Sequence, residues 1–128
     1  LLLTVDDIMR KGHDSPVVKD TMKVKQVLFA ITKSRAGSAS VVDSKGKLVG
    51  IFTDGDLRRH LETNPRLIEC EVKYAMTKNP TVITGDRLAA EAFDILRSKR
   101  IDELPVVDNK RRPVGLLDVQ DIIKAGLV

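Results

Sequence analysis

The chain of 128 residues is poor in the residues on which several functional classes depend. It contains no tryptophan, one tyrosine and three phenylalanines, so few rings are available to stack on nucleic-acid bases. Its net charge is only +4, and no basic recognition helix stands out. This mild excess of positive charge indicates an anionic small partner or a merely basic surface rather than nucleic acid.

Cysteine occurs once, at Cys70, which excludes an intramolecular disulfide and a cysteine-based zinc cluster. A single thiol suits a reducing cytoplasm, and we interpret Cys70 as a packing residue. The two histidines, His13 and His60, lie in different segments, and no carboxylate cluster surrounds either of them at ligand spacing. We therefore expect no metal site and no catalytic histidine. A glycine-rich phosphate loop and a Ser-His-Asp set are also missing.

Long hydrophobic runs are absent, since no stretch approaches the ~18 apolar residues of a membrane-spanning helix. The chain begins with three leucines and no methionine, without the basic flank that precedes a signal peptide. We therefore expect a piece of a longer cytoplasmic protein with no membrane or nucleic-acid partner. The 42% of apolar and 31% of charged residues suit one ordinary globular domain or two very small ones.

The sequence repeats itself with a nearly constant spacing. VDDIM (Val5–Met9) returns as VKYAM (Val72–Met76), and LVGIFTDGDL (Leu48–Leu57) returns as PVGLLDVQDI (Pro113–Ile122). Between these segments an apolar helical pattern and a Val-Val-Asp sequence also recur. We predict repeat 1 at residues 1–62, a linker at residues 63–70 and repeat 2 at residues 71–128.

Each repeat shows the same order of local patterns. A short helix is followed by a short extended piece, a longer amphipathic helix, a hairpin of two apolar runs and a final helix. The predicted fold class is α+β, a pseudo-twofold pair in which each repeat has the order β-α-β-β-α after a short leading helix. A unit of about 60 residues buries little surface alone, so we expect the repeats to share one core and to leave a cleft at their seam.

The final helix of each repeat opens on a pair of polar residues. In repeat 1, Thr53 is followed three residues later by Asp56, and in repeat 2 Asp118 is followed by Asp121. One interpretation is structural. Both pairs have the spacing of a capping box, and such a cap stabilises a helix by about 1 kcal/mol.

The other interpretation is a ligand site. A helix N-terminus offers free backbone N–H groups and the positive end of the helix dipole, which suit a phosphate. Thr53 adds a hydroxyl, and Asp56 can accept hydrogen bonds from a ribose diol. Gly50 and Gly115, shortly before the two pairs, are expected to let the backbone come close to a ligand.

The duplicated pattern of glycine, two apolar residues, Thr or Ser, two variable residues and Asp resembles the CBS domain, which is found in tandem pairs. The resemblance covers nearly the whole chain. More narrowly, DIM (Asp7–Met9), GIFTDGDLRR (Gly50–Arg59) and the ending DIIKAGLV (residues 121–128) resemble the C-terminal CBS pair of bacterial arabinose 5-phosphate isomerases. Those enzymes serve the 3-deoxy-D-manno-octulosonate (Kdo) pathway, which feeds lipopolysaccharide biosynthesis. Their N-terminal sugar isomerase domain carries the catalysis and has no counterpart in this sequence.

The resemblance implies a set of ligand contacts and no catalytic residue. Thr53 would contact a phosphate, while Asp56 and, in repeat 2, Asp121 would contact a ribose. Other residues would surround the base: Ser15, Val17, Ser38, Ala39, Asp102 and Leu104. Further candidates are Arg58, Arg100 and Asp118.

Asp118 departs from the family pattern, because it puts a carboxylate where Thr or Ser should meet a phosphate. At ~4 Å and an effective dielectric constant near 20, two like unit charges repel by about 4 kcal/mol. We expect repeat 2 to reject a phosphate unless Arg111, Arg112 or another cation intervenes. The module should then have at most one good phosphate site.

These observations predict a regulatory nucleotide-sensing module that is not itself an enzyme. It requires no cofactor, and its ligand is expected to be AMP, ATP or a cytidine nucleotide such as CMP-Kdo. The expected partners are the N-terminal isomerase domain of the same chain and a second copy, in a dimer or a larger oligomer. The alternatives are a purely structural dimerisation module, a fragment with isomerase activity of its own, and an adenine-nucleotide-sensing CBS pair of another enzyme or a transporter.

Overall fold

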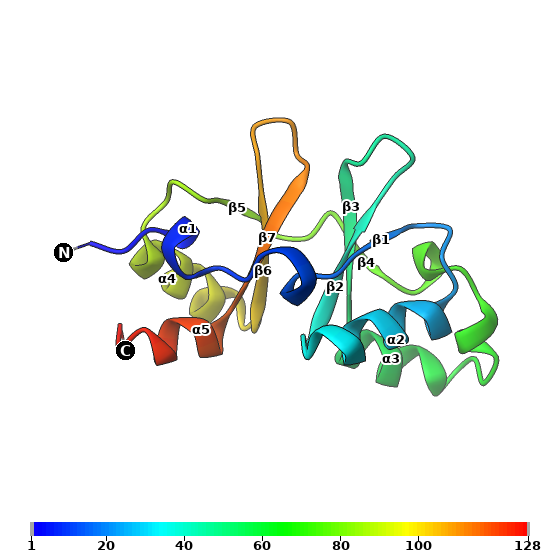
Figure 1. Cartoon of the computed structure of the whole chain (residues 1–128). Helices are drawn as coiled ribbons and strands as arrows, with labels where there is room; N and C mark the ends of the chain where they lie inside the picture. Colours follow the sequence, from blue (N-terminus) through cyan, green and yellow to red (C-terminus); the bar gives the residue numbers. More distant parts are fainter. Residues whose placement is uncertain (1, 128) are drawn as a thin grey trace.

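The computed structural model describes residues 2–127 and shows two similar halves, each with a small sheet and helices packed beside it (Figure 1). The hairpin turns of both halves project to one side of the molecule, and the four longer helices lie toward the other side. None of the helices in the described residues is long and apolar enough to cross a bilayer. The first half contains β1 (Val17–Lys19), α2 (Val24–Ser34), β2 (Ser38–Val42), β3 (Leu48–Thr53) and α3 (Asp54–Leu61). The second half contains β5 (Ile83–Thr84), α4 (Ala89–Lys99), β6 (Glu103–Val107), β7 (Pro113–Asp118) and α5 (Val119–Lys124).

The two halves have the same topology, which confirms the predicted α+β fold and the order β-α-β-β-α. In each half a short strand pairs in parallel with the first strand of the hairpin, β1 with β2 and β5 with β6. The hairpin strands then pair in antiparallel fashion, and the register places Ser38 opposite Thr53 and Glu103 opposite Asp118. These four residues therefore stand at equivalent places, beside the N-terminus of the final helix of each repeat.

The helix between the strands is positioned by one apolar face. In α2 the buried residues are Val24, Val27 and Ile31, which recur at helical spacing. The corresponding helix α4 buries Ala89, Ala92 and Leu96. Both helices end on an arginine in the left-handed conformation, Arg35 with φ 55° and Arg100 with φ 54°. The chain leaves each helix there and turns directly toward the hairpin.

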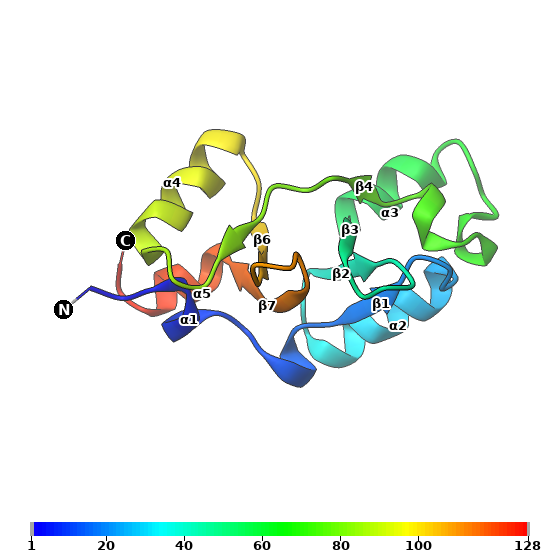
Figure 2. The same ribbon diagram turned by 90° about the horizontal axis from the view of Figure 1, so that it is seen from above.

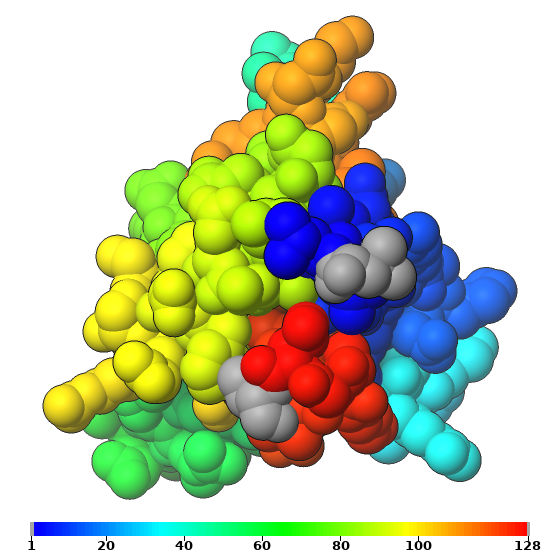
Figure 3. Space-filling model, turned by 90° about the vertical axis from the view of Figure 1, so that its left-hand side faces the viewer, coloured from blue at the N-terminus to red at the C-terminus, as the bar shows by residue number. Residues whose placement is uncertain are grey.

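The leading helices are exchanged between the repeats. The first, α1 (Val5–Ile8), puts Val5 into the apolar cluster around Leu104 and Leu117 of repeat 2. The second is a 3₁₀ helix, η3 (Val72–Tyr74), which puts Val72 into the cluster of repeat 1 around Phe52. Figure 3 shows the N-terminal residues packed among the segments of repeat 2, beside the C-terminal helix.

The expectation of one shared core is therefore wrong, because the buried apolar residues form two clusters, one in each half. Each half completes its own core with an apolar segment taken from the other repeat. The predicted boundaries at residues 62 and 71 remain a prediction, and the outermost residues 1 and 128 lie outside the described part of the chain. The exchange means that neither repeat can move far without pulling on the core of its neighbour.

The exchanged segments also explain the two glycines of the hairpins. After η3, strand β4 (Thr77–Lys78) pairs with β3, and its neighbour Met76 lies against Gly50 so closely that a Cβ there would collide with the sulfur. At Gly115 a Cβ would stand 2.5 Å from the sulfur of Met9 and 2.8 Å from the backbone oxygen of Arg10. The expectation that these glycines admit a ligand is wrong. Each glycine leaves room for the segment that crosses over from the other repeat. The path of these segments between the halves is visible in Figure 2.

The substitution Gly115→Ala should destabilise the fold by about 2 kcal/mol, because the new methyl group overlaps a backbone oxygen that cannot swing away. Urea unfolding of the purified chain measures this loss. The exchange of the neighbouring Val114, which is 44% exposed, for alanine should change stability by less than about 0.5 kcal/mol. Equal effects of the two substitutions would contradict the close packing of Met9 and Arg10 on β7.

Candidate functional site

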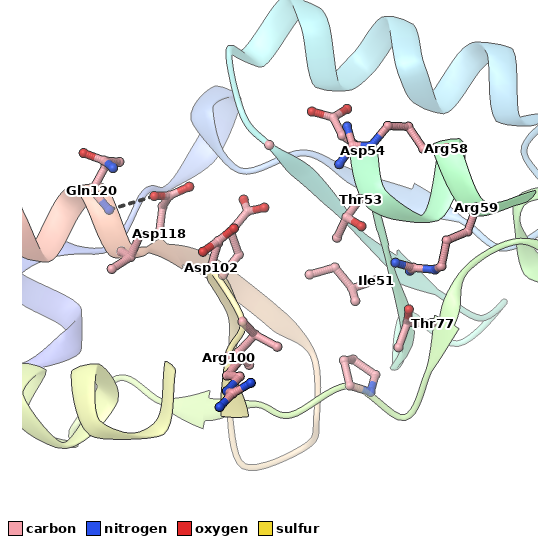
Figure 4. Close-up of a pocket in the computed structure, with 16 residues that line it drawn as sticks. Ile51, Thr53, Asp54, Arg58, Arg59, Thr77, Arg100, Asp102, Asp118 and Gln120 are labelled. Atoms are coloured by element: carbon pink, nitrogen blue, oxygen red, sulfur yellow. Dashed lines mark hydrogen bonds between the residues drawn. The ribbon is translucent and has the colours of Figure 1, made fainter. Parts of the chain in front are cut away.

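A cleft with a volume of about 660 Å³ runs between the two repeats, and Figure 4 shows its walls. The N-terminal turn of α3 and the strand β3 form one wall, together with Thr77 and Pro80 from the segment that enters repeat 2. The opposite wall comes from the turn after α4, the start of β6 and the N-terminus of α5. The charged residues of the lining are Asp54, Arg58, Arg59, Arg100, Asp102, Glu103 and Asp118.

Thr53 sits where β3 passes into α3 and is bonded to Asp56 in both directions. The Asp56 backbone N–H donates to the Thr53 hydroxyl (3.2 Å), and the Thr53 backbone N–H donates to the Asp56 carboxylate (3.0 Å). The Thr53 hydroxyl donates to the same carboxylate at 3.2 Å. The predicted capping box is thus present, and Thr53 still lines the cleft.

Asp56 lies behind the cleft wall and is only 2% exposed. Besides the two groups of Thr53, its carboxylate accepts from the hydroxyl of Thr77 (2.9 Å) and from the guanidinium of Arg59. A carboxylate has about four acceptor positions, so all of them are occupied. The ribose contact implied for Asp56 stays a prediction, and such a contact requires one of these partners to leave.

Asp121 has a corresponding arrangement in repeat 2. It accepts from the backbone N–H of Asp118 (3.0 Å) and from Nε of Arg10 (3.3 Å), whose guanidinium also donates to the backbone oxygen of Arg35 (3.1 Å). Arg10 follows Met9 as Thr77 follows Met76, so the two contacts are equivalent. Each motif aspartate is therefore held by the exchanged segment of the other repeat, which sequence reasoning missed. The polar residue directly after each repeated methionine was the signal that could have revealed it.

The wall of repeat 1 carries positive charge. Arg58 and Arg59 project from α3 beside its N-terminus, and both side chains are exposed to solvent (Figure 4). A third arginine, Arg100, lies on the opposite wall, in the turn after α4 and below Asp102 in Figure 4. Arg58 and Arg59 both follow Asp56 on the first turns of the helix, where charges usually form a solvated face, and the sequence indicated only that one of the two could reach an anionic ligand. An anion beside the first turn of α3 would meet the guanidinium groups of repeat 1.

The wall of repeat 2 is acidic. Asp102, Glu103 and Asp118 lie together there, and the register places Glu103 and Asp118 directly across from each other. Burial raises the pKa of Glu103 to about 7, and the charge of Asp118 adds to the rise while the hydroxyl of Ser38 opposes it. The equivalent pair in repeat 1 consists of two hydroxyls, Ser38 and Thr53. Among the described residues, no group of acidic, histidine or cysteine side chains is arranged to hold a metal ion.

The difference between the two walls bears on the predicted asymmetry. Asp118 faces the cleft as a helix cap that accepts from the N–H of Gln120 (2.8 Å). Neither of the arginines considered as a screen reaches it: Arg112 pairs with Asp108 (2.9 Å), and Arg111 donates to the backbone oxygen of Leu48 (3.3 Å). The repulsion expected between Asp118 and a phosphate thus stands without these two counter-charges.

The remaining predicted site residues divide into groups. Thr53 and Asp102 line the cleft, and so do the further candidates Arg58, Arg100 and Asp118. Ser15 and Val17 instead line a second cavity of about 470 Å³ beside α2. Ser38, Ala39 and Leu104 are fully buried within the hairpins, so their side chains face the interior.

Comparison with known proteins identifies this architecture. The family model of the CBS domain matches residues 5–63 and again residues 70–128. The chain is 38% identical over its whole length to arabinose 5-phosphate isomerase KdsD of Pseudomonas aeruginosa and 33% identical to KdsD of Escherichia coli. It spans 39% of the length of each of these relatives.

Solved structures agree with the family match. The CBS domain pair of protein MJ0100, in complex with 5′-methylthioadenosine and S-adenosyl-L-methionine, superposes with a TM-score of 0.88 at 25% identity, over 98% of this chain and 97% of that one. CBSX2 in complex with AMP superposes with a TM-score of 0.82 at 26% identity, over 98% and 96% of the two chains. The chain therefore belongs to the CBS domain family, and it consists of two CBS domains in tandem.

Proposed function

We propose that this CBS pair is a regulatory module that senses a nucleotide in the cleft between its repeats. The observation that carries the proposal is the cleft itself, which has about 660 Å³ of space, a helix N-terminus and three arginines from two repeats. The complexes of related pairs with AMP and with S-adenosyl-L-methionine support a ligand of this chemical class. The module binds and transmits, and the chemistry of the parent protein takes place elsewhere.

The polarity of the cleft orients the ligand. Its phosphate lies against Thr53, Arg58 and Arg59, since this wall offers the cations and the free N–H groups at the start of α3. The base extends toward Asp102 and Glu103, whose oxygens accept hydrogen bonds from ring and amino N–H groups. The acidic wall of repeat 2 rejects a second phosphate, so the pair has one phosphate site. The ribose roles of Asp56 and Asp121 belong to the same proposal.

Two observations bear on the identity of the base. The related complexes contain adenosine derivatives, so AMP and ATP are the first ligands to test. The match to arabinose 5-phosphate isomerases over the whole chain favours a cytidine nucleotide such as CMP-Kdo, because the end product of a pathway is a suitable feedback signal. In this setting the pair is the C-terminal part of a cytoplasmic isomerase in lipopolysaccharide biosynthesis.

Regulation follows from linkage. A ligand that touches both walls binds one arrangement of the repeats better than another, and that preference biases the attached isomerase domain. Dimerisation through a second copy would carry the same bias between chains. A second function, that of a purely structural dimerisation module, is favoured by one observation: all acceptor positions of Asp56 are filled by the protein itself.

A thermal-shift panel with AMP, ATP, CMP and CMP-Kdo separates these two functions. A nucleotide at 100 times its Kd should stabilise the fold by about 2.7 kcal/mol. The variant Arg58→Gln, altered at the wall that holds the phosphate, should lose most of this shift, whereas Lys110→Gln in the exposed hairpin turn should keep it. No shift with any of the four nucleotides at millimolar concentration would leave the structural function as the better account.

A further inference from the structure

The carboxylate of Asp56 has four partners, and they differ in how easily they can leave. The N–H of Thr53 is backbone and fixed by the strand. The hydroxyls of Thr53 and Thr77 are carried on short side chains of β3 and β4, and although Thr77 is exposed, its hydroxyl cannot move far from Asp56 while β4 stays paired with β3. The fourth partner, Arg59, has a side chain that is 66% exposed. The pair is open to water only at its arginine end, because Asp56 is 2% exposed, and water solvates the guanidinium when that side chain swings away. Arg59 is thus the one readily exchangeable partner.

Arg59 also belongs to the cleft. Its guanidinium lines the cavity together with Thr77, and in Figure 4 it lies between Thr77 and the first turn of α3. In this position it covers Asp56, which itself contributes nothing to the lining. Movement of this one side chain would open an oxygen of Asp56 toward the cavity and would leave a free guanidinium beside it.

We propose that Arg59 is an exchangeable latch over Asp56. A ligand diol takes its place on the carboxylate, and the released guanidinium pairs with the phosphate of the same ligand. The latch rests on the proposed function, since it requires a nucleotide in the cleft. It makes Arg59 a specificity-determining residue: a nucleoside must break the Arg59–Asp56 pair without replacing it, whereas a nucleotide supplies a new anion for Arg59. The cleft therefore discriminates in favour of phosphorylated ligands.

The test compares AMP with adenosine, and CMP with cytidine, by calorimetry on the wild-type chain and on Arg59→Ala. Removal of the latch should tighten nucleoside binding by up to about fivefold, because the competing ion pair is gone. It should weaken nucleotide binding about tenfold, because a charge-assisted hydrogen bond to the phosphate is lost. These opposite shifts are the signature of exchange. The neutral Arg59→Gln variant should behave in the same way and guards against a misfolded alanine variant.

Two further variants separate the outcomes. Arg58→Ala should weaken nucleotide binding without tightening nucleoside binding, since Arg58 makes no contact with Asp56. Arg66→Ala, in the exposed segment after α3, should alter neither. If the wild-type chain binds neither AMP nor CMP, and neither of their nucleosides, both the proposed function and the latch are wrong. A wild-type chain that binds nucleotides, with Arg59→Ala weakening nucleotide and nucleoside equally, would overturn the latch alone.

Discussion

The substitution Asp56→Ala is expected to lower the free energy of unfolding by about 3 kcal/mol. The carboxylate is 2% exposed and joins three elements, because its partners come from the end of β3, from α3 and from β4. Alanine removes the carboxylate half of the capping box and leaves the N–H of Thr53 without its acceptor, while the hydroxyl of the exposed Thr77 loses its bond to the carboxylate and turns to water. Each buried polar group that loses its partner costs about 1–3 kcal/mol.

Urea unfolding measures this loss, and Asp54→Ala is the matched control. Asp54 is an acidic residue in the same first turn of α3, but it is exposed, so its removal should cost less than about 1 kcal/mol. Similar losses for the two variants would show that the carboxylate of Asp56 does not hold the exchanged segment. The alanine variant is also expected to abolish nucleotide binding, but its lower stability would mix loss of the fold with loss of the ligand contact. Asp56→Asn keeps an acceptor oxygen and is therefore the better variant for calorimetry.

The sequence predicted those parts of the fold that depend on local patterns. The repeat, the apolar face of α2, the two hairpins and the capping residues Thr53 and Asp118 can all be read from residues close together in the chain. The order of the elements along the chain could not reveal that each leading helix packs on the other repeat. Val5 and Val72 would fit an apolar surface of either repeat, and only the three-dimensional path of the chain decides which one they cover.

The site was predicted in the same uneven way. Of the residues that the resemblance implied, Thr53 and Asp102 line the cleft, as do the further candidates Arg58, Arg100 and Asp118. The others do not contribute to its lining: Asp56, Asp121, Ser15, Val17, Ser38, Ala39 and Leu104. The resemblance could not show that the two motif aspartates are occupied, since Arg10 and Thr77 are separated from them by 111 and 21 positions. The capping and ligand interpretations of Thr-x-x-Asp thus describe the same side chains in two states, and the stability of the free state decides how readily a ligand can compete.

The substitution Glu103→Gln is expected to stabilise the protein at pH 8. Burial raises the pKa of Glu103 from 4.5 in the unfolded chain to about 7 in the fold, so the folded state holds a proton that the unfolded state releases between these values. This contribution to stability is complete below pH 4.5 and is lost as the pH rises through 7. Above that pH a carboxylate remains buried beside Asp118. Glutamine has the same shape and no charge, so the variant should gain about 3 kcal/mol relative to wild type between pH 4.5 and pH 8.

Urea unfolding at both pH values isolates this effect, because only the difference between variant and wild type is compared and all other titrating groups cancel. Glu62→Gln, at the exposed end of α3, should show no pH-dependent gain. A Glu103→Gln variant whose stability changes with pH in parallel with wild type would mean that Glu103 titrates normally. The cleft connects this titration to binding. A protonated Glu103 uses one oxygen as a donor, whereas a charged Glu103 only accepts hydrogen bonds, so a base with N–H groups should bind more tightly above pH 7. Nucleotide affinity that is unchanged between pH 6 and pH 8 would exclude contact between the base and Glu103.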